Sequence, residues 1–140
     1  IPIVKALREG LAGNRVKRVY GILNGTCNYI LTTMREGRRE FGEVLAEAQK
    51  LGYAELDPAT DVDGIDAAHK LAILAALAYG SEVNFAGVHV EGIRHVSALD
   101  IDYAVFACET HGDLPNNFEL QNNILSILVT DTTTPGSLAP

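Results

Sequence analysis

The sequence predicts an α/β (α+β) fold, in which helices cover one face of a small mixed sheet. The chain has 140 residues, of which 47% are hydrophobic and 21% charged, so it can build one real core. Apolar residues recur with the helical period along most of the chain, whereas few segments are rich in β-branched residues. Helices therefore dominate, and the sheet that they cover is small.

The N-terminal part of the sequence predicts a helix, a strand and a second helix. Apolar residues recur at helical spacing from Ile3 to Leu11, and Gly13 is the stop signal. The run VKRVYGIL predicts a strand over residues 16–23, and helical spacing resumes over 27–37. Because the first residue is not Met and already lies inside a helical pattern, we expect the chain to be cut from something longer.

The central part predicts two helices on either side of an acidic loop. The segment 41–52 is amphipathic and closes with a glycine. The segment 65–80 is apolar on most sides, so we expect it to be buried. Asp63 is expected to cap it, with Asp66 as the return partner of a capping box, and Gly80 to end it.

The C-terminal part carries weaker signals. Residues 87–93 predict a strand, and residues 97–107 a helix with Ser97 as its cap. Residues 122–131 are a further strand candidate, and the low-complexity tail 131–140 is expected to be flexible.

Charge and composition limit the partners. The net charge of −7 argues against nucleic acid and anionic membranes, because both need a basic surface. The two cysteines, Cys27 and Cys108, form no disulfide framework or metal-ligand pattern, which is typical of a reduced cytosolic protein. The sequence has no apolar run of the roughly 20 residues that a membrane span needs, and no signal peptide. We therefore expect a cytoplasmic location.

The stretch from Gly52 to Leu74 gathers five carboxylates beside a single lysine. They are Glu55, Asp57, Asp61, Asp63 and Asp66, with Lys70 after them. Such carboxylates repel one another, so the stretch needs an explanation, and three hypotheses compete.

The first hypothesis is a calcium loop. Asp61, Asp63 and Gly64 fit positions three, five and six of an EF-hand loop. Positions one and twelve would be Ala59 and Lys70, where an acid and a bidentate glutamate are required. The pattern therefore argues against calcium, and we expect no metal site.

The second hypothesis is purely structural. Asp63 and Asp66 would cap the following helix, a cap being worth about 0.5–2 kcal/mol. Asp66 and Lys70 stand four residues apart and would form a surface pair worth about 0.3–0.5 kcal/mol. Asp57 before a proline starts a turn.

The third hypothesis is an active site for a ligand with an amine and a hydroxyl. Carboxylates at the start of a buried helix are tolerated when they receive a cationic ligand, and a lysine beside them can pass a proton to or from an oxygen. The break NGT at residues 24–26 offers a glycine for close backbone approach and a hydroxyl beside it. Spacing alone leaves the second and third hypotheses open.

Three stretches resemble the catalytic, substrate-binding domain of homoserine dehydrogenase. They are GILNGTCNYILTTM, FGEVLAEAQKLGYAELDPATDVDGIDAAHKLAIL and GIRHVSALDIDYA. Their central motif is an acid before D-P, followed by D-x-x-G-x-D-x-x-x-K. The resemblance implies that residues 1–104 form part of that domain with its fold, and that 105–140 is a divergent C-terminal segment.

The resemblance also implies a role for each matching residue. Lys70 matches the lysine that acts as catalytic acid–base, and Asp66 matches the aspartate that helps to place the substrate and that lysine. Glu55 matches the glutamate that holds the ammonium group of the substrate, and Asp61 matches another aspartate that contacts the substrate.

The N/S-G-T element of the family matches Gly25 and Thr26. In the family this element lies near the substrate and the nicotinamide, so Gly25 is also a candidate for cofactor contact. Cys27 stands where a threonine or another small residue is common.

The reaction that the resemblance implies is hydride transfer between NAD(P) and a four-carbon amino acid. It interconverts L-aspartate 4-semialdehyde and L-homoserine in the biosynthesis of threonine, methionine and isoleucine, in an enzyme that is a homodimer. The acidic loop suits the ammonium group of the substrate, and Lys70 suits the reacting oxygen.

No G-x-G-x-x-G fingerprint occurs in these 140 residues. We therefore expect a nucleotide-binding domain outside the chain to hold most of NAD(P), and the isolated chain to be inactive. The family's second important lysine and its monovalent-cation site would also lie upstream. The alternative is a non-catalytic amino-acid-binding or oligomerisation module of the same fold.

Overall fold

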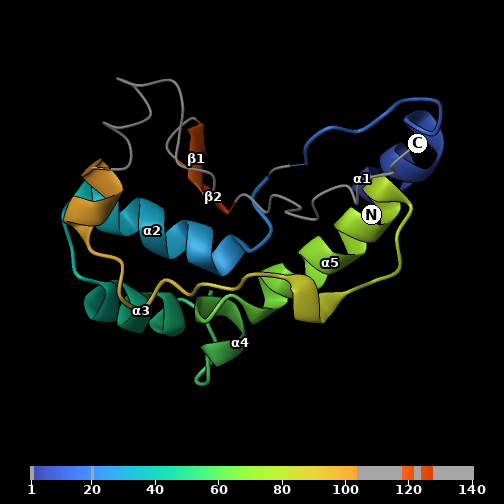
Figure 1. Ribbon diagram of the computed structural model, residues 1–140. Helices are drawn as coiled ribbons and strands as arrows, with labels where there is room; N and C mark the ends of the chain where they lie inside the picture. Colours follow the sequence, from blue (N-terminus) through green and yellow to red (C-terminus); the bar gives the residue numbers. More distant parts are fainter. Residues whose placement is uncertain (1, 20, 104–117, 122–123, 128–140) are drawn as a thin grey trace.

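Helices form most of the described part of the chain, which comprises residues 2–19, 21–103, 118–121 and 124–127 of a computed structural model (Figure 1). The elements in chain order are α1 (Pro2–Lys5), the π-helical turn η1 (Ala6–Gly10), α2 (Gly25–Gly37), α3 (Phe41–Lys50), α4 (Ala59–Val62), α5 (Ile65–Tyr79), the 3₁₀ turn η2 (Phe85–Gly87), β1 (Phe118–Gln121) and β2 (Ile124–Ile127). Residues 98–103 are also helical.

The predicted helices at the start of the chain are confirmed. α1 and η1 together cover residues 2–10 of the predicted 1–13. α2 begins two residues earlier than predicted, because Asn24 caps it: the Asn24 side chain accepts a hydrogen bond of 2.8 Å from the backbone N–H of Cys27. α2 ends at Gly37, and the residue after it, Arg38, adopts the left-handed conformation with φ of 50°.

The helices around the acidic loop are confirmed, but the predicted cap of α5 is wrong. α3 and α5 lie where the periodicity places them, and α5 ends at Gly80 in the left-handed conformation. The N-cap of α5 is Gly64, with φ of 82° and no side-chain cap. Asp63 instead forms an ion pair with Arg94, so a distant cation outcompetes the local cap. α4 was not predicted.

The predicted mixed sheet is not confirmed. The segments 16–23 and 87–93 form no strand in their described residues, which exclude residue 20. The described strands β1 and β2 pair antiparallel, with Phe118 opposite Ile127. β2 lies within the predicted strand segment 122–131. An extended, β-branched segment becomes a strand only when it finds a partner.

The segment before the helical residues 98–103 is hydrogen-bonded to α4 and not to a neighbouring strand. The backbone N–H of Ile93 donates to the carbonyl oxygen of Val62 at 2.8 Å. Further along, Ser97 caps the helical turn 98–103 as predicted: its hydroxyl accepts from the N–H of Asp100 at 3.2 Å, and the Asp100 carboxylate accepts from the Ser97 N–H at 2.8 Å. The predicted tail 131–140 and most of 105–140 lie outside the described residues.

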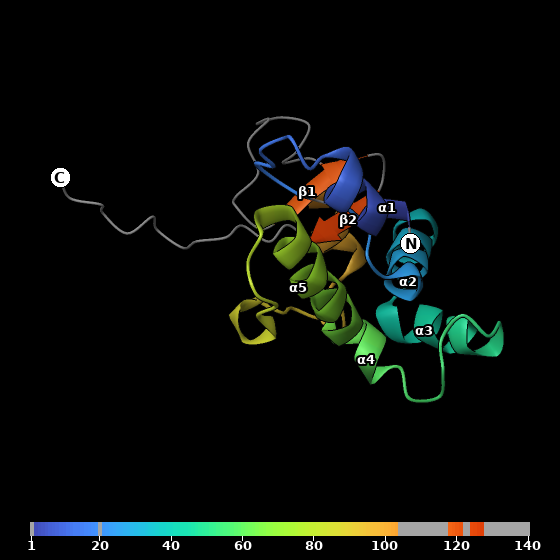
Figure 2. The same cartoon turned by 90° about the vertical axis from the view of Figure 1, so that its right-hand side faces the viewer.

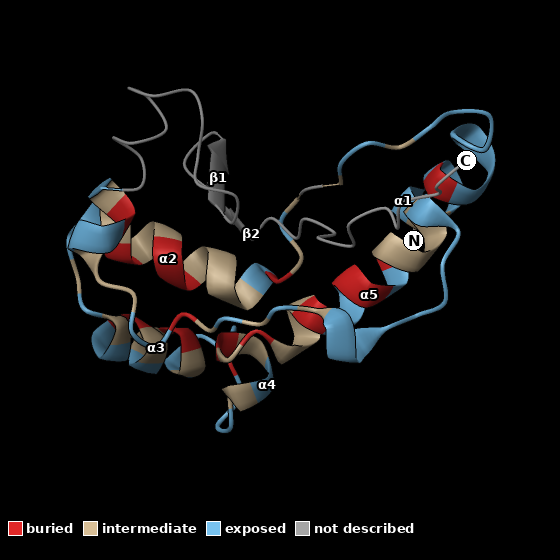
Figure 3. Cartoon of the chain, viewed as in Figure 1, coloured by how far each residue is buried: buried red, intermediate tan, exposed pale blue. Residues whose placement is uncertain are grey.

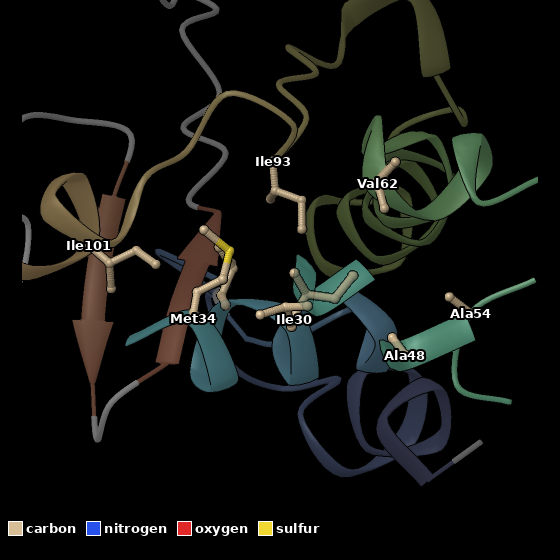
Figure 4. Packing of buried hydrophobic residues seen from close by; sticks show 9 residues of the cluster. Ile30, Met34, Ala48, Ala54, Val62, Ile93 and Ile101 are labelled. Atoms are coloured by element: carbon tan, nitrogen blue, oxygen red, sulfur yellow. The ribbon is translucent and has the colours of Figure 1, made fainter. Parts of the chain in front are cut away.

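The hydrophobic core lies where α2, α3 and α4 meet (Figures 3 and 4). Its largest fully buried side chains are Ile30, Met34, Val44 and Val62. Burying each such side chain contributes about 1.5–3 kcal/mol. Ile93 joins this cluster from the later segment (Figure 4), so residues far apart in the sequence close one core.

α5 leads from this core towards the N-terminus of the chain. Figure 1 shows it running from α4 to α1, and the rotated view in Figure 2 separates it from α2 and α3. α4 therefore joins two parts of the molecule, and the acidic loop lies at that junction. Each helix in the described ranges is too short or too polar to span a lipid bilayer.

Candidate active site

Three elements bring a set of polar side chains together beside α4. Asn24 precedes α2, Asp61 lies in α4, and Asp66 and Lys70 lie in the first turns of α5. Gly64 makes the turn between α4 and α5 with a positive φ, and a Cβ there would lie 3.0 Å from the carbonyl oxygen of Glu91. Only glycine suits this turn, which places both aspartates against Asn24.

Asn24 links the two aspartates. Its Nδ2 donates to Asp61 Oδ1 at 2.7 Å and to Asp66 Oδ2 at 2.9 Å, while its Oδ1 accepts from the N–H of Cys27. Asn24 is also buried, with 8% of its surface exposed. The hydrogen bonds offset the repulsion that two neighbouring carboxylates would otherwise feel.

Lys70 is held at the open side of this cluster. Its Nζ donates to Asp66 Oδ2 at 2.5 Å and to the carbonyl oxygen of Leu23 at 2.9 Å. The Lys70 side chain is 49% exposed and that of Asp66 28% exposed. Because an ammonium group carries three donors, these contacts leave one N–H for a ligand.

The charge state of Asp66 follows from these contacts. Burial acts to raise the pKa of Asp66, but the hydrogen bonds from Lys70 and Asn24 outweigh it and hold that pKa below its usual range. Asp66 is therefore an anion at neutral pH, as a residue that positions an ammonium group must be.

Cys27 closes the inner side of the cluster as a protonated thiol. Burial, followed by the charges of Asp61 and Asp66, raises the pKa of Cys27 to about 12. Its Sγ donates to the carbonyl oxygen of Asp61 at 3.2 Å. Cys27 also lines a small pocket of about 50 Å³, whose other walls include Asn24 and Leu31. The thiol is therefore a structural group and not a nucleophile.

The other predicted residues lie near the cluster in different ways. Gly25 is the exposed first residue of α2, and a Cβ there would meet nothing within 4 Å. The hydroxyl of Thr26 donates to the carbonyl oxygen of Tyr53 at 3.0 Å. Glu55 is exposed, and its backbone oxygen accepts from the side chain of Gln49 at 2.9 Å. The described contacts thus unite Asp61, Asp66 and Lys70, but they do not include the Glu55 carboxylate.

A second polar network supports the loop that carries Glu55. The hydroxyl of Tyr29 donates to Glu47 at 3.0 Å, and Arg39 pairs with the same carboxylate at 2.6 Å. The rings of Tyr29 and Tyr53 lie 4.8 Å apart between centroids. This network fixes Tyr53, and with the Thr26 contact it ties the start of the loop to α2 and α3.

The calcium hypothesis gains no support. Within the residues that the structure describes, no group of three or more His, Cys, Asp or Glu side chains is placed to hold a metal ion. Asp63 is paired with Arg94, and hydrogen bonding and this ion pair hold the pKa of Asp63 below its usual range.

Asn24 is the site residue that the sequence reasoning missed. Its partners lie 37 and 42 residues away, so no local spacing reveals them. The available signal was an asparagine as the first residue of the NGT element at residues 24–26, since asparagine is a favoured N-cap.

The chain is similar in sequence to known proteins of one family. A sequence model described as homoserine dehydrogenase matches residues 2–110. The curated homoserine dehydrogenases of Neisseria gonorrhoeae and Synechocystis sp. are 56% and 58% identical to the chain over 104 residues, which is 74% of this chain and 24% of each relative. The chain thus spans about a quarter of the length of the curated relatives it matches.

Solved structures show the same similarity. A homoserine dehydrogenase from Thiobacillus denitrificans matches with a TM-score of 0.72 and 53% identity, covering 76% of this chain and 25% of that one. A putative homoserine dehydrogenase from Archaeoglobus fulgidus matches with a TM-score of 0.71 and 36% identity, covering 91% and 39%. The chain belongs to the homoserine dehydrogenase family.

Proposed function

We propose that Asn24, Asp61, Asp66 and Lys70 form the substrate side of a homoserine dehydrogenase. That enzyme interconverts L-homoserine and L-aspartate 4-semialdehyde with NAD(P). The observation that carries the proposal is the placement of Lys70, which Asp66 and the Leu23 carbonyl hold with one N–H left over. This arrangement suits a proton donor to a substrate oxygen.

The charges of the cluster suit an amino acid. Asp61 and Asp66 carry two negative charges and Lys70 one positive charge, so a cationic group is still favoured beside them. Asp61 is only partly buried and Asp66 is already engaged by Lys70, so we assign the ammonium group of the substrate to Asp61. Glu55, exposed on the adjoining loop, would add a second carboxylate when that loop covers the ligand.

Lys70 would donate a proton to the reacting oxygen, or accept one from it, depending on the direction of the reaction. In the direction of reduction, one N–H of the ammonium donates to the carbonyl oxygen and delivers its proton as the alkoxide forms. In the direction of oxidation the same nitrogen takes the proton of the hydroxyl group. Asp66 keeps Lys70 in place in both directions and stabilises its charged form.

We assign the nicotinamide end of the cofactor to the edge of the described structure formed by Gly25 and Thr26. Bound NAD(P) supplies or accepts the hydride. Gly25, with open space at its Cβ position and at the start of α2, would let a flat ring approach the backbone, and Thr26 borders it. The 140 residues contain no glycine-rich dinucleotide fingerprint, so we assign most of the cofactor contacts to a separate domain. A solved relative described as a hyperthermophilic archaeal homoserine dehydrogenase mutant is in complex with NADPH, which supports NADP(H) as the cofactor.

The proposed reaction belongs to the biosynthesis of threonine, methionine and isoleucine, which is a cytoplasmic process. We further propose a homodimer for the intact enzyme. The sequence resemblance supports both proposals.

A chimeric enzyme tests the function. Residues 1–104 would replace the matching 104 residues of the Neisseria gonorrhoeae relative, which supplies the rest of the protein. We expect reduction of NAD(P) that depends on L-homoserine. A folded chimera that binds homoserine but transfers no hydride would favour the non-catalytic amino-acid-binding module. A folded chimera that neither binds nor turns over homoserine would contradict the proposal.

A further inference from the structure

Asn24 is the point at which the two aspartates of the cluster are joined. Its amide nitrogen contacts one oxygen of each carboxylate, and its amide oxygen caps α2. An amide group has two N–H donors, and both are used here. With 8% of its surface exposed, Asn24 makes these contacts largely shielded from water, where hydrogen bonds to charged groups are strong.

The orientation of this amide is fixed by its partners. If the two ends were exchanged, Oδ1 would face the carboxylates of Asp61 and Asp66, and Nδ2 would face the N–H of Cys27. Every contact would then join two donors or two acceptors. The cap of α2 and the aspartate contacts therefore require one another.

An amide also suits the charge of the site better than the other polar side chains. A lysine or arginine in its place would cancel negative charge and compete with a cationic ligand. An aspartate would add a third negative charge beside Asp61 and Asp66. A neutral group with two donors holds the carboxylates together and leaves their charge available.

We propose that Asn24 is the positioning residue of the site, which holds Asp61 and Asp66 side by side without cancelling their charge. Asp66 can then fix Lys70, and Asp61 can receive an ammonium group. The second part rests on the proposed function, whereas the first part rests only on the contacts of Asn24.

The proposal has a consequence for the titration of Asp66. The charged and titratable groups around Asp66 are Lys70 and His69 on its own helix, Asp61 from α4 and the thiol of Cys27 from α2. Without the donors of residue 24, repulsion between the carboxylates favours proton uptake. Lys70 then loses its anionic partner as the pH falls.

The substitution Asn24→Asp tests this role. Aspartate has the same shape and caps a helix as well as asparagine does, so the start of α2 is preserved. It removes both N–H donors and also adds a negative charge beside Asp61 and Asp66, so an uncharged variant is compared with it below. The matched control is Asn84→Asp, because the Asn84 side chain also caps a helical turn by accepting from the N–H of Gly87, at 3.1 Å.

The measurement is a ¹³C NMR titration of the Asp66 carboxyl in the 140-residue chain. We expect Asn24→Asp to raise the titration midpoint of Asp66 by about one unit or more. We expect Asn84→Asp to leave it within about 0.2 units of the wild type. An unchanged midpoint in folded Asn24→Asp would overturn the proposal.

A second, uncharged variant separates the loss of the donors from the added charge and guards against failure to fold. Asn24→Ser keeps a good cap but has a single donor, so it can serve at most one carboxylate. We expect a shift of the Asp66 midpoint in the same direction but smaller. A folded serine variant with the wild-type midpoint would contradict the role of the two donors.

Homoserine binding separates this proposal from the proposed function. The affinity for L-homoserine is measured by calorimetry at pH 7 and at pH 5. We expect it to decrease from pH 7 to pH 5, and to decrease more in Asn24→Asp than in the wild type. If the wild-type chain and the chimera both fail to bind homoserine while the Asp66 midpoint shifts as expected, the proposed function is wrong and the positioning role stands. If homoserine binds and the midpoint does not shift, the function stands and the role of Asn24 is wrong.

Discussion

Cys27 is held as an inert thiol inside the candidate site. Burial and the nearby charges of Asp61 and Asp66 raise its pKa to about 12, against an ordinary value of 9.0. The thiolate is the reactive form, so its population at neutral pH falls by about a thousandfold. The same carboxylates that suit a cationic ligand thus protect the cysteine beside them.

Alkylation tests this directly. With iodoacetamide at pH 8, we expect Cys27 in the folded chain to react at least about a hundredfold more slowly than in the chain unfolded by urea. Peptide mapping by mass spectrometry distinguishes Cys27 from Cys108. Equal rates for Cys27 in the folded and unfolded chains would show that the thiol is neither buried nor influenced by the aspartates.

Asp66 makes a pH-dependent contribution to stability. Its pKa in the folded chain is lowered from 3.8, despite burial, by hydrogen bonds from Lys70 and Asn24. A carboxyl with a lowered folded pKa stabilises the protein above its ordinary pKa, and that stability is lost as the pH falls through the folded pKa.

We expect Asp66→Asn to lower the free energy of unfolding by about 1 kcal/mol at pH 7. The difference from the wild type should shrink below about pH 4, where the unfolded carboxyl takes up its proton. Urea unfolding at several pH values measures it. A difference that grows on acidification would show that the sign of the pKa shift is wrong.

At the scale of elements, residues 92–94 hold the junction of α4 and α5 in place. A Cβ at Gly92 would lie 2.7 Å from the carbonyl oxygen of Val62 and 2.8 Å from the Cα of Asp63. Arg94 pairs with Asp63 across the same contact. The close approach of two backbones, together with an ion pair, fixes the turn that presents Asp61 and Asp66.

These two contacts differ in strength. Gly92→Ala forces backbone apart, so we expect it to lower the free energy of unfolding by about 1–3 kcal/mol. Arg94→Ala removes an ion pair whose side chains are 40% and 41% exposed, so solvent screens it and we expect a smaller loss of stability than for Gly92→Ala.

The control for the glycine substitution is Gly42→Ala in α3. A Cβ at Gly42 meets nothing within 4 Å, and alanine favours a helix, so stability should stay the same or rise slightly. Denaturant unfolding compares the three variants. If Gly92→Ala were as stable as Gly42→Ala, residues 92–94 would not be pressed against the α4–α5 junction.

Across the molecule, what could be predicted from the sequence was local. α2, α3 and α5 follow from apolar periodicity and glycine stop signals, which act within a few residues. The pair of Asp66 and Lys70 follows from helical spacing for the same reason. Strands at 16–23 and 87–93 depend on distant partners, and the described residues provide none.

In the candidate site, too, contacts between residues far apart in the sequence could not be predicted. The contact of Asn24 with Asp66 spans 42 residues, and the ion pair of Asp63 with Arg94 spans 31. Because its contacts are so distant in sequence, residue spacing did not reveal Asn24 as a site residue. Because Asp63 pairs with Arg94, it does not cap α5 as predicted. The roles proposed for Lys70 and Asp61 come from the resemblance to a family, because local physics left them open.

We propose above that Lys70 is the acid–base group of a homoserine dehydrogenase. The most direct measurement is the turnover of the chimeric enzyme with Lys70→Ala, compared with Lys50→Ala, which removes an exposed lysine at the end of α3. We predict that Lys70→Ala lowers kcat by roughly 10²-fold or more, while Lys50→Ala has little effect. Near-normal turnover of Lys70→Ala would show that Lys70 is not the acid–base group.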